Sequence, residues 1–112
     1  FIKLQKARRI TMAITCIARF QAKEECYDEL YKWMTDHLID MKEHAGNLNC
    51  YASGNSESGL ITIYEKWNSQ EDHEAYLAWR TEVGHLEHVV SLLATDGPEI
   101  TYEDVLHEHS NE

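Results

Sequence analysis

The side chains that could perform chemistry gather around one short stretch, Leu60 to Trp67. Glu65 lies within it and can act as a general acid or base if it is buried in a cavity. The alternative for this carboxylate is an ion pair across a sheet with Arg19, which would keep it ionised. Aromatic side chains that can pack around a ligand or fill a core accompany Glu65 in the sequence, namely Tyr51, Tyr64, Trp67 and Tyr76.

Histidine provides a further candidate. His73 precedes Tyr76 by three residues, so both side chains face the same side if this segment is a helix. The neighbours Glu71, Asp72 and Glu74 favour an exposed His73 in the imidazolium form, and contact with a ligand is the alternative. The sequence leaves both roles of His73 open.

Metal-binding patterns are weak in this chain. His85 and His88 are three residues apart on a predicted helix, and His107 and His109 lie close together near the C-terminal end. A metal site at either pair needs a third ligand from elsewhere, and nothing in the sequence nominates one. The sequence therefore predicts no metal site.

Alternating hydrophobic residues predict the strands that position these side chains. Residues 13–20 are rich in β-branched side chains, and residues 47–53 and Leu60 to Trp67 flank a polar connection bounded by glycines. Such a connection predicts a hairpin, so the two strands beside it should pair antiparallel. Residues 100–106 have the pattern of a final strand.

The helices are predicted from apolar residues at three-and-four spacing. One such stripe runs through residues 23–44, and Gly46 is placed to end that helix. Ser69 is a good N-cap for a second helix that reaches about Arg80. A further helical pattern continues to about Ala94, with Gly84 marking the break.

This order of elements predicts an α+β fold of the ferredoxin-like βαββαβ type with a four-stranded antiparallel sheet. Helices on one side would leave the other face of the sheet uncovered, and a second copy of the chain is the simplest cover. Within residues 60–67, Tyr64 and Trp67 fall on opposite faces. We therefore expect one of them in the core and the other in a cavity between subunits.

Composition excludes several classes of partner. The chain has 112 residues, enough for one domain with a modest core. Its formal net charge of −10 opposes binding to nucleic acid and to anionic membrane surfaces. Its apolar runs fall far short of the roughly twenty residues that cross a bilayer. We expect a soluble homodimer whose other partner is a small molecule.

The ends of the chain differ from the middle. Residues 1–11 contain Lys3, Lys6, Arg8 and Arg9 but no apolar signal-peptide core. We predict an N-terminal extension or vector-encoded leader in residues 1–11, a domain in residues 12–106 and a polar tail in residues 107–112. The three widely spaced cysteines and the lack of a secretion signal favour reduced thiols and a cytoplasmic location.

Three landmarks resemble the antibiotic biosynthesis monooxygenase family. They are Gly46, the strand sequence Tyr64-Glu65-Lys66-Trp67 and the helix-opening Ser69. In that family a glycine ends the first helix, a Tyr-Glu-x-Trp strand precedes a capped helix, and two subunits pack sheet to sheet. The resemblance extends over residues 12–106 and implies a dimeric α+β barrel.

The resemblance also implies an activity, that of a cofactor-independent monooxygenase that oxidises a quinol-like or polycyclic aromatic substrate with O2. Such a reaction needs a base, hydrogen-bond donors and a dry apolar cavity. Family members often have a histidine about nine residues after the strand tryptophan. Here that position is Tyr76, with His73 one turn earlier. The implied catalytic residues are Trp67, His73 and Tyr76, and the implied substrate contacts are Tyr51, Tyr64 and Glu65.

Two other functions use the same fold. A non-catalytic dimeric module for small-ligand binding or stress response is favoured by Tyr76 at the histidine position. A haem-degrading relative would have an asparagine in the first strand, and residues 13–20 contain none. A closed apolar cavity with a shifted His or Glu would favour catalysis, whereas a water-filled cavity without a base would favour a binding module.

Overall fold

Four strands form one antiparallel sheet in the computed structural model, which describes residues 13–109. They are β1 (Ile14–Gln21), β2 (Asn47–Asn55), β3 (Leu60–Trp67) and β4 (Glu99–Asp104), in the order β2-β3-β1-β4. The predicted ferredoxin-like sheet is confirmed. The predicted leader, residues 1–11, lies outside the described residues.

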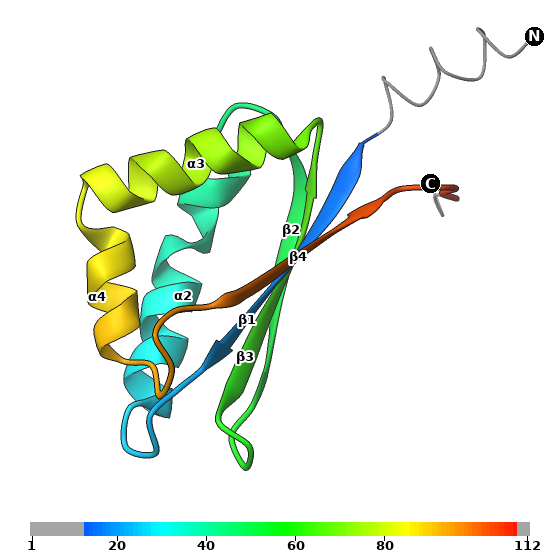
Figure 1. Cartoon of the computed structure of the whole chain (residues 1–112). Coiled ribbons are helices and arrows are strands. Elements are labelled where there is room, and N and C mark those ends of the chain that lie inside the picture. The colour runs from blue at the N-terminus through cyan, green and yellow to red at the C-terminus, as the bar shows by residue number, and fades with distance from the viewer. Residues whose placement is uncertain (1–12, 110–112) are drawn as a thin grey trace, which may run out of the picture.

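Three helices cover one face of this sheet and leave the other open (Figure 1). They are α2 (Tyr27–Lys42), α3 (Gln70–Glu82) and α4 (His85–Ser91). The break between α3 and α4 falls at Gly84, as predicted, where a φ of +84° favours glycine over other residues. The second helix of the fold is therefore two shorter helices that meet at an angle.

Helix α2 ends at Lys42, four residues before the Gly46 predicted to stop it. Gly46 instead occupies the turn into β2, with a φ of +89°. A Cβ atom at this position would lie 2.4 Å from the side chain of Asp72 at the start of α3. The glycine thus permits both the left-handed turn and the close approach of α3.

The start of α3 matches its predicted cap. The Ser69 hydroxyl accepts a hydrogen bond of 3.1 Å from the Asp72 backbone N–H. Glu71 and Asp72 stand in the first turn, where the helix dipole favours negative charge. This cap determines the residue at which α3 begins, and so which of its side chains face the core.

Strand pairing determines which side chains meet. Glu65 of β3 lies opposite Cys16 of β1, and Tyr64 lies between Ile17 of β1 and Tyr51 of β2. A register shift between Asn47 and Asn49 interrupts the β2 ladder near its start. On β3 the helix-covered face consists of Ile61, Ile63, Glu65 and Trp67, which share one face because side chains alternate along a strand.

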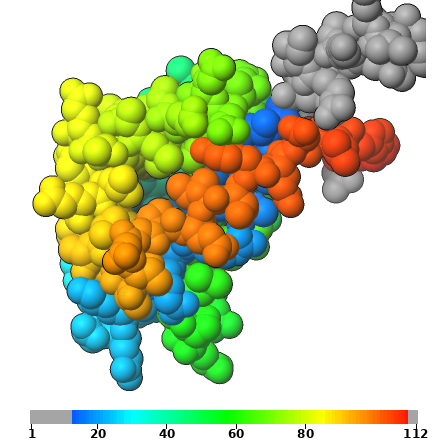
Figure 2. Space-filling view, in the orientation of Figure 1, coloured from blue at the N-terminus to red at the C-terminus, as the bar shows by residue number. Residues whose placement is uncertain are grey.

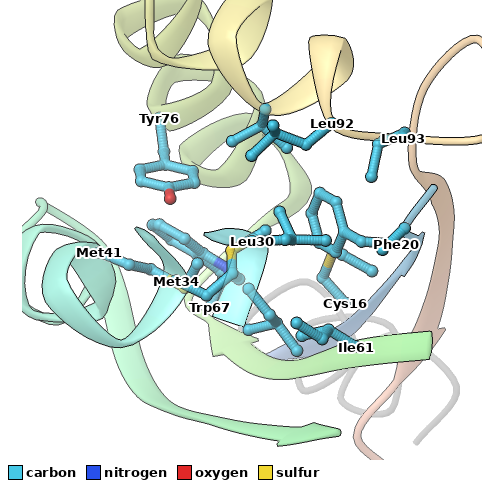
Figure 3. Close-up of a cluster of buried hydrophobic side chains, with 14 residues drawn as sticks. Cys16, Phe20, Leu30, Met34, Met41, Ile61, Trp67, Tyr76, Leu92 and Leu93 are labelled. Atoms are coloured by element: carbon cyan, nitrogen blue, oxygen red, sulfur yellow. The ribbon is translucent and has the colours of Figure 1, made fainter. Parts of the chain in front are cut away.

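The core fills the space between the sheet and the helices (Figure 3). Leu30 and Met34 of α2 pack there with side chains of β1, β3 and α4. Strand β4 is shifted from the predicted residues 100–106 and ends at Asp104, although Val105 N–H still bonds the Ala13 carbonyl at 3.0 Å. Within residues 13–109 no helix is both long and apolar enough to span a membrane.

Candidate functional site

A cavity lies within a single chain, between the helix-covered face of the sheet and the three helices. It measures about 50 Å³, and the surface shows a recess between α3, α4 and β4 (Figure 2). Its walls are mostly apolar, and the polar groups that interrupt them include Glu65, His73, Tyr76 and Arg80. This cavity lies on the covered face of the sheet, and a cavity between subunits stays a prediction.

Glu65 is the buried carboxylate of the site, with 4% of its surface exposed. Its Oε1 accepts a hydrogen bond of 2.9 Å from the Trp67 indole N–H. Burial raises the pKa of Glu65 to about 7, because water no longer solvates the carboxylate and the Trp67 hydrogen bond offsets only part of that loss. The carboxyl can therefore gain or lose a proton near neutral pH.

The expected ion pair between Glu65 and Arg19 is wrong. Arg19 lies on the opposite face of the sheet, where its Nη1 is 3.2 Å from Oε1 of Glu99. Along β1 the side chains alternate, and the residue opposite Glu65 is Cys16. Glu65 thus keeps a carboxyl that can titrate.

His73 is also buried, with 1% of its surface exposed, which contradicts the expected exposed imidazolium. Its Nδ1 forms a hydrogen bond of 2.7 Å with the Tyr102 hydroxyl, and its Nε2 lies 3.4 Å from Glu65 Oε1. Burial lowers the pKa of His73 to about 4 despite the nearby charge of Glu74. The ring lies in the core although its sequence neighbours are acidic, so desolvation decides its protonation state.

These contacts create a continuous polar row through the core, from the indole N–H of Trp67 through Glu65 and His73 to Tyr102. If the Tyr102 hydroxyl donates to Nδ1, the Nε2 of neutral His73 carries the ring proton and faces Glu65. Glu65 and His73 both line the cavity. The row therefore holds the Glu65 carboxyl beside the cavity, where it can accept a proton from a bound group.

Cys16 completes the buried end of this row. Its Sγ lies 3.5 Å from His73 Nε2. Burial, the charge of Glu65 and a hydrogen bond to Glu65 all raise the pKa of the Cys16 thiol, so it stays protonated and is a poor nucleophile. One potential metal-ligating atom each from Cys16, Glu65 and His73 lies within 4.8 Å of the others.

Tyr76 and Arg80 form the other polar part of the site. The Tyr76 hydroxyl accepts a hydrogen bond of 2.7 Å from Arg80 Nε, and Figure 3 shows this hydroxyl directed toward Trp67 and the sheet. Burial raises the pKa of Tyr76 to about 12, so it remains a phenol at neutral pH. Arg80 is 6% exposed and also donates to the His37 carbonyl at 2.8 Å and to Asp40 at 3.3 Å.

Sequence reasoning missed Arg80 as a site residue. The guanidinium carbon lies 5.4 Å from the ring centroid of Trp33 and 5.0 Å from that of Trp79, distances typical of cation–π contacts. The only sequence signal was a basic residue in the last predicted turn of a helix. His85, one of the metal candidates, instead lies 2.8 Å from Arg80 Nη1 through its Nδ1.

The predicted site residues divide between two faces of the sheet. Trp67, Glu65, His73 and Tyr76 lie together on the covered face. Tyr51 and Tyr64 stack on the open face, with centroids 4.9 Å apart and an interplanar angle of 19°. His107 and His109, the second pair of metal candidates, bring their Nε2 atoms within 2.8 Å in the exposed tail, and His88 of the first pair is exposed.

Comparison with known proteins agrees with the observed fold. The family model described as antibiotic biosynthesis monooxygenase matches residues 13–89. No curated protein matches the chain.

Solved structures share the fold at low sequence identity. A protein of unknown function from Nitrosomonas europaea, NE2512, is 15% identical with a TM-score of 0.76, over 91% of this chain and 97% of that one. A point mutant of SnoaB, a cofactor-independent oxygenase from Streptomyces nogalater, is 11% identical with a TM-score of 0.69, over 86% and 95%. The ActVA-Orf6 monooxygenase of Streptomyces coelicolor, solved with nanaomycin D, is 14% identical with a TM-score of 0.69, over 91% and 95%.

Proposed function

Because the chain belongs to the antibiotic biosynthesis monooxygenase family, we propose that it oxygenates an electron-rich phenol or quinol with O2 in the cavity between the sheet and the helices. The substrate itself supplies the electrons, so the protein needs no flavin. SnoaB, described as a cofactor-independent oxygenase, has a similar fold.

The observation that carries this proposal is the buried Glu65 with a pKa of about 7 on the wall of an apolar cavity. A base works best when its pKa lies near the working pH. Above pH 7 the Glu65 carboxylate can take the proton of a phenolic hydroxyl, and the neutral imidazole of His73 at 3.4 Å helps to hold that carboxylate in place. Glu65 is therefore the base that we propose for the reaction.

Deprotonation makes the substrate a better electron donor, because the phenolate gives up an electron to O2 more readily than the phenol. For a phenol with an adjacent ring methylene, the CH2 group becomes C=O. The second oxygen atom of O2 leaves as water with the two hydrogen atoms of that methylene. All four electrons come from the substrate, so atoms and electrons balance without another reductant.

Arg80 and Tyr76 are proposed to stabilise the anion that forms. Both line the cavity, and Arg80 carries a fixed positive charge held among aromatic rings. A preorganised charge in a water-poor site stabilises a developing anion more strongly than it would in water. Tyr76 receives the Arg80 hydrogen bond and keeps its own hydroxyl proton to donate to the substrate.

The cavity sets a condition on the substrate. About 50 Å³ holds a few water molecules, so a ring system must displace wall side chains to enter. Helix α4, which borders the recess, has only seven residues after a glycine break. The same small volume favours the second candidate, a non-catalytic module that binds a small ligand.

Dimerisation through the open face is part of the proposal. Ile17, Tyr51 and Tyr64 form a row across that face, and Tyr51 is 54% exposed. Apolar side chains on the open face of a sheet form a surface that a two-fold partner can bury. The cavity lies on the other face, so each subunit would contain its own site.

Oxygen uptake across a panel of phenols and quinols tests the activity. We expect Glu65→Gln to lower kcat by about 10²- to 10⁴-fold, because the amide cannot accept the proton. Glu103→Gln is the matched control, since Glu103 lies exposed on the sheet in β4. In the active protein kcat should rise with pH through about 7, as Glu65 becomes a carboxylate.

Trp67→Phe sharpens this test. Phenylalanine keeps much of the bulk of the core but removes the indole donor to Glu65, and that donor lowers the Glu65 pKa. The pH profile should therefore move to higher pH. The alternative is a binding module. It would be assigned if no compound caused oxygen uptake and an aromatic ligand nevertheless bound saturably.

A further inference from the structure

Three side chains that ligate metals converge at the inner end of the polar row. Cys16 comes from β1, Glu65 from β3 and His73 from α3, so three separate elements bring them together. All three are buried, and one ligand atom from each lies within 4.8 Å of the other two. Thiolate, carboxylate and imidazole are the three side-chain ligands that Zn²⁺ uses in proteins.

The distances fit a tetrahedral centre. With Zn–N and Zn–O bonds of about 2.0–2.1 Å and Zn–S bonds of about 2.3 Å, tetrahedral angles place N and O about 3.3 Å apart and N and S about 3.6 Å apart. Here His73 Nε2 is 3.4 Å from Glu65 Oε1 and 3.5 Å from Cys16 Sγ. Both distances from His73 therefore match those of ligands on one tetrahedral ion, and the Cys16 and Glu65 ligand atoms lie within 4.8 Å of each other.

The surroundings also suit a metal. In the tautomer whose Nδ1–H donates to the Tyr102 hydroxyl at 2.7 Å, Nε2 is unprotonated and left for the metal, and this hydrogen bond fixes the ring orientation. Glu65 and His73 line the cavity, so a fourth ligand can come from water or from a molecule bound there. A thiolate and a carboxylate together would balance the two positive charges of the ion, so the buried centre would carry no net charge.

We propose that Cys16, Glu65 and His73 form a binding site for a single divalent zinc-like cation. The ion occupies the base of the proposed oxygenase site, so binding it removes Glu65 from proton transfer. The metal thus blocks the oxygenase, and this consequence alone rests on the proposed function. The ligand set differs from the histidine pairs that the sequence offered.

Cobalt titration tests the site directly. Co²⁺ added to metal-free protein should give a thiolate-to-cobalt charge-transfer band that saturates at one ion per chain, and Zn²⁺ should displace it. Cys16→Ser should abolish the band and weaken zinc binding by more than about 100-fold. Cys26→Ser is the matched control, because Cys26 is a partly buried thiol outside the group, and it should leave the band unchanged.

Further variants distinguish this site from other ligands. Tyr102→Phe leaves all three ligands but removes the hydroxyl behind His73, and should weaken zinc about 10-fold. A variant without His107 and His109 should keep full stoichiometry. Because Cys16 lies in the core, circular dichroism and the unfolding midpoint without metal must show that Cys16→Ser is folded, and Glu65→Gln provides a second ligand variant.

Two results would overturn the proposal: a cobalt band that survives Cys16→Ser, or wild-type protein that binds neither ion more tightly than the folded Cys16→Ser variant does. Both readouts are independent of catalysis. Zinc binding without oxygen uptake by metal-free protein would reject the proposed oxygenase and keep the metal site. Oxygen uptake that zinc does not inhibit, together with the absence of a cobalt band, would reject the metal site and keep the proposed oxygenase.

Discussion

The two faces of strand β3 differ in almost every physical respect, although they alternate along the same eight residues. On the covered face, Glu65 and Trp67 are buried and hydrogen-bonded to one another. On the open face, Tyr64 stacks on Tyr51 and Lys66 pairs with Glu108. The covered face therefore holds the groups suited to chemistry, and the open face holds the surface suited to a partner.

Electrostatics separates the two faces as clearly as packing does. The covered face shifts the pKa of Glu65 up and that of His73 down, because both groups lose water. The open face holds its charges as solvent-exposed pairs such as Arg19 with Glu99. A charge on the open face contributes to solubility, whereas a charge on the covered face loses its hydration and is the stronger candidate for a function.

The largest expected difference between the faces is in core packing. Trp67→Ala should lower the free energy of unfolding by about 3–5 kcal/mol, because it empties a fully buried position. Tyr64→Ala, three residues away on the other face, should lower it by about 1 kcal/mol or less in the monomer. Urea denaturation of both variants checks this, and equal losses would contradict the division into two faces.

Stability against pH gives the next largest effect. Glu65 has a folded pKa of about 7 against 4.5 unfolded, so the native state binds more protons and stability falls as pH rises from 4.5 to 7. His73 has a folded pKa of about 4 against 6.5 unfolded, so the unfolded state binds more protons and stability rises with pH from about 4 to 6.5. The two slopes oppose one another between about pH 4.5 and 6.5.

Replacing either Glu65 or His73 should reveal the pH dependence of stability that the other residue produces. From pH 4.5 to 6.5, Glu65→Gln should gain about 2 kcal/mol of stability relative to wild type, and His73→Gln should lose a similar amount. Urea denaturation across this range measures both, with His88→Gln as the exposed control. Variants that follow the wild-type curve would mean that the buried pair does not titrate as described.

A third prediction concerns the open face. Tyr51→Asp should raise the dimer dissociation constant by about 10- to 100-fold, because the two-fold contact would bury a charge without a partner. Tyr31→Asp is a closely matched control, since Tyr31 on α2 is 53% exposed and Tyr51 is 54% exposed. Light scattering over a dilution series distinguishes them. A wild-type monomer at all concentrations would reject the dimer.

The smallest expected effect is on the exposed ion pair of the open face. Arg19→Ala should lower the free energy of unfolding by less than about 1 kcal/mol, and added salt should remove the difference. Arg80→Ala, on α3 over the covered face, should lower the free energy of unfolding by about 3 kcal/mol. Added salt should not remove this difference, because that guanidinium is buried. Denaturation at low and high salt compares the two arginines.

Sequence patterns over a few neighbouring residues were sufficient to predict the fold. Alternation located β1 and β3, the Ser69 cap located α3, and Gly84 located its end, because each depends on residues close in sequence. Tyr64 and Trp67 were correctly placed on opposite faces. The ends of α2 and β4 were less accurate, since tertiary contacts decide where a helix or strand stops.

The candidate site was harder to predict, because its contacts are long-range. His73 meets Cys16, 57 residues earlier, and Tyr102, 29 residues later, and nothing near His73 in the sequence indicates either. Its acidic neighbours suggested an exposed side chain. Pairing β1 with β3 in register would have placed Cys16 opposite Glu65 and excluded Arg19 as its partner.

The register of β3 has a consequence for how the protein tolerates change. A slip of one residue against β1 would turn Tyr64 and Lys66 into the core and Glu65 and Trp67 into solvent. The same error would therefore destroy the proposed pocket and the proposed subunit contact together. Insertions or deletions within residues 60–67 should therefore be tolerated poorly, whereas the turn at residues 56–59 can absorb changes in length.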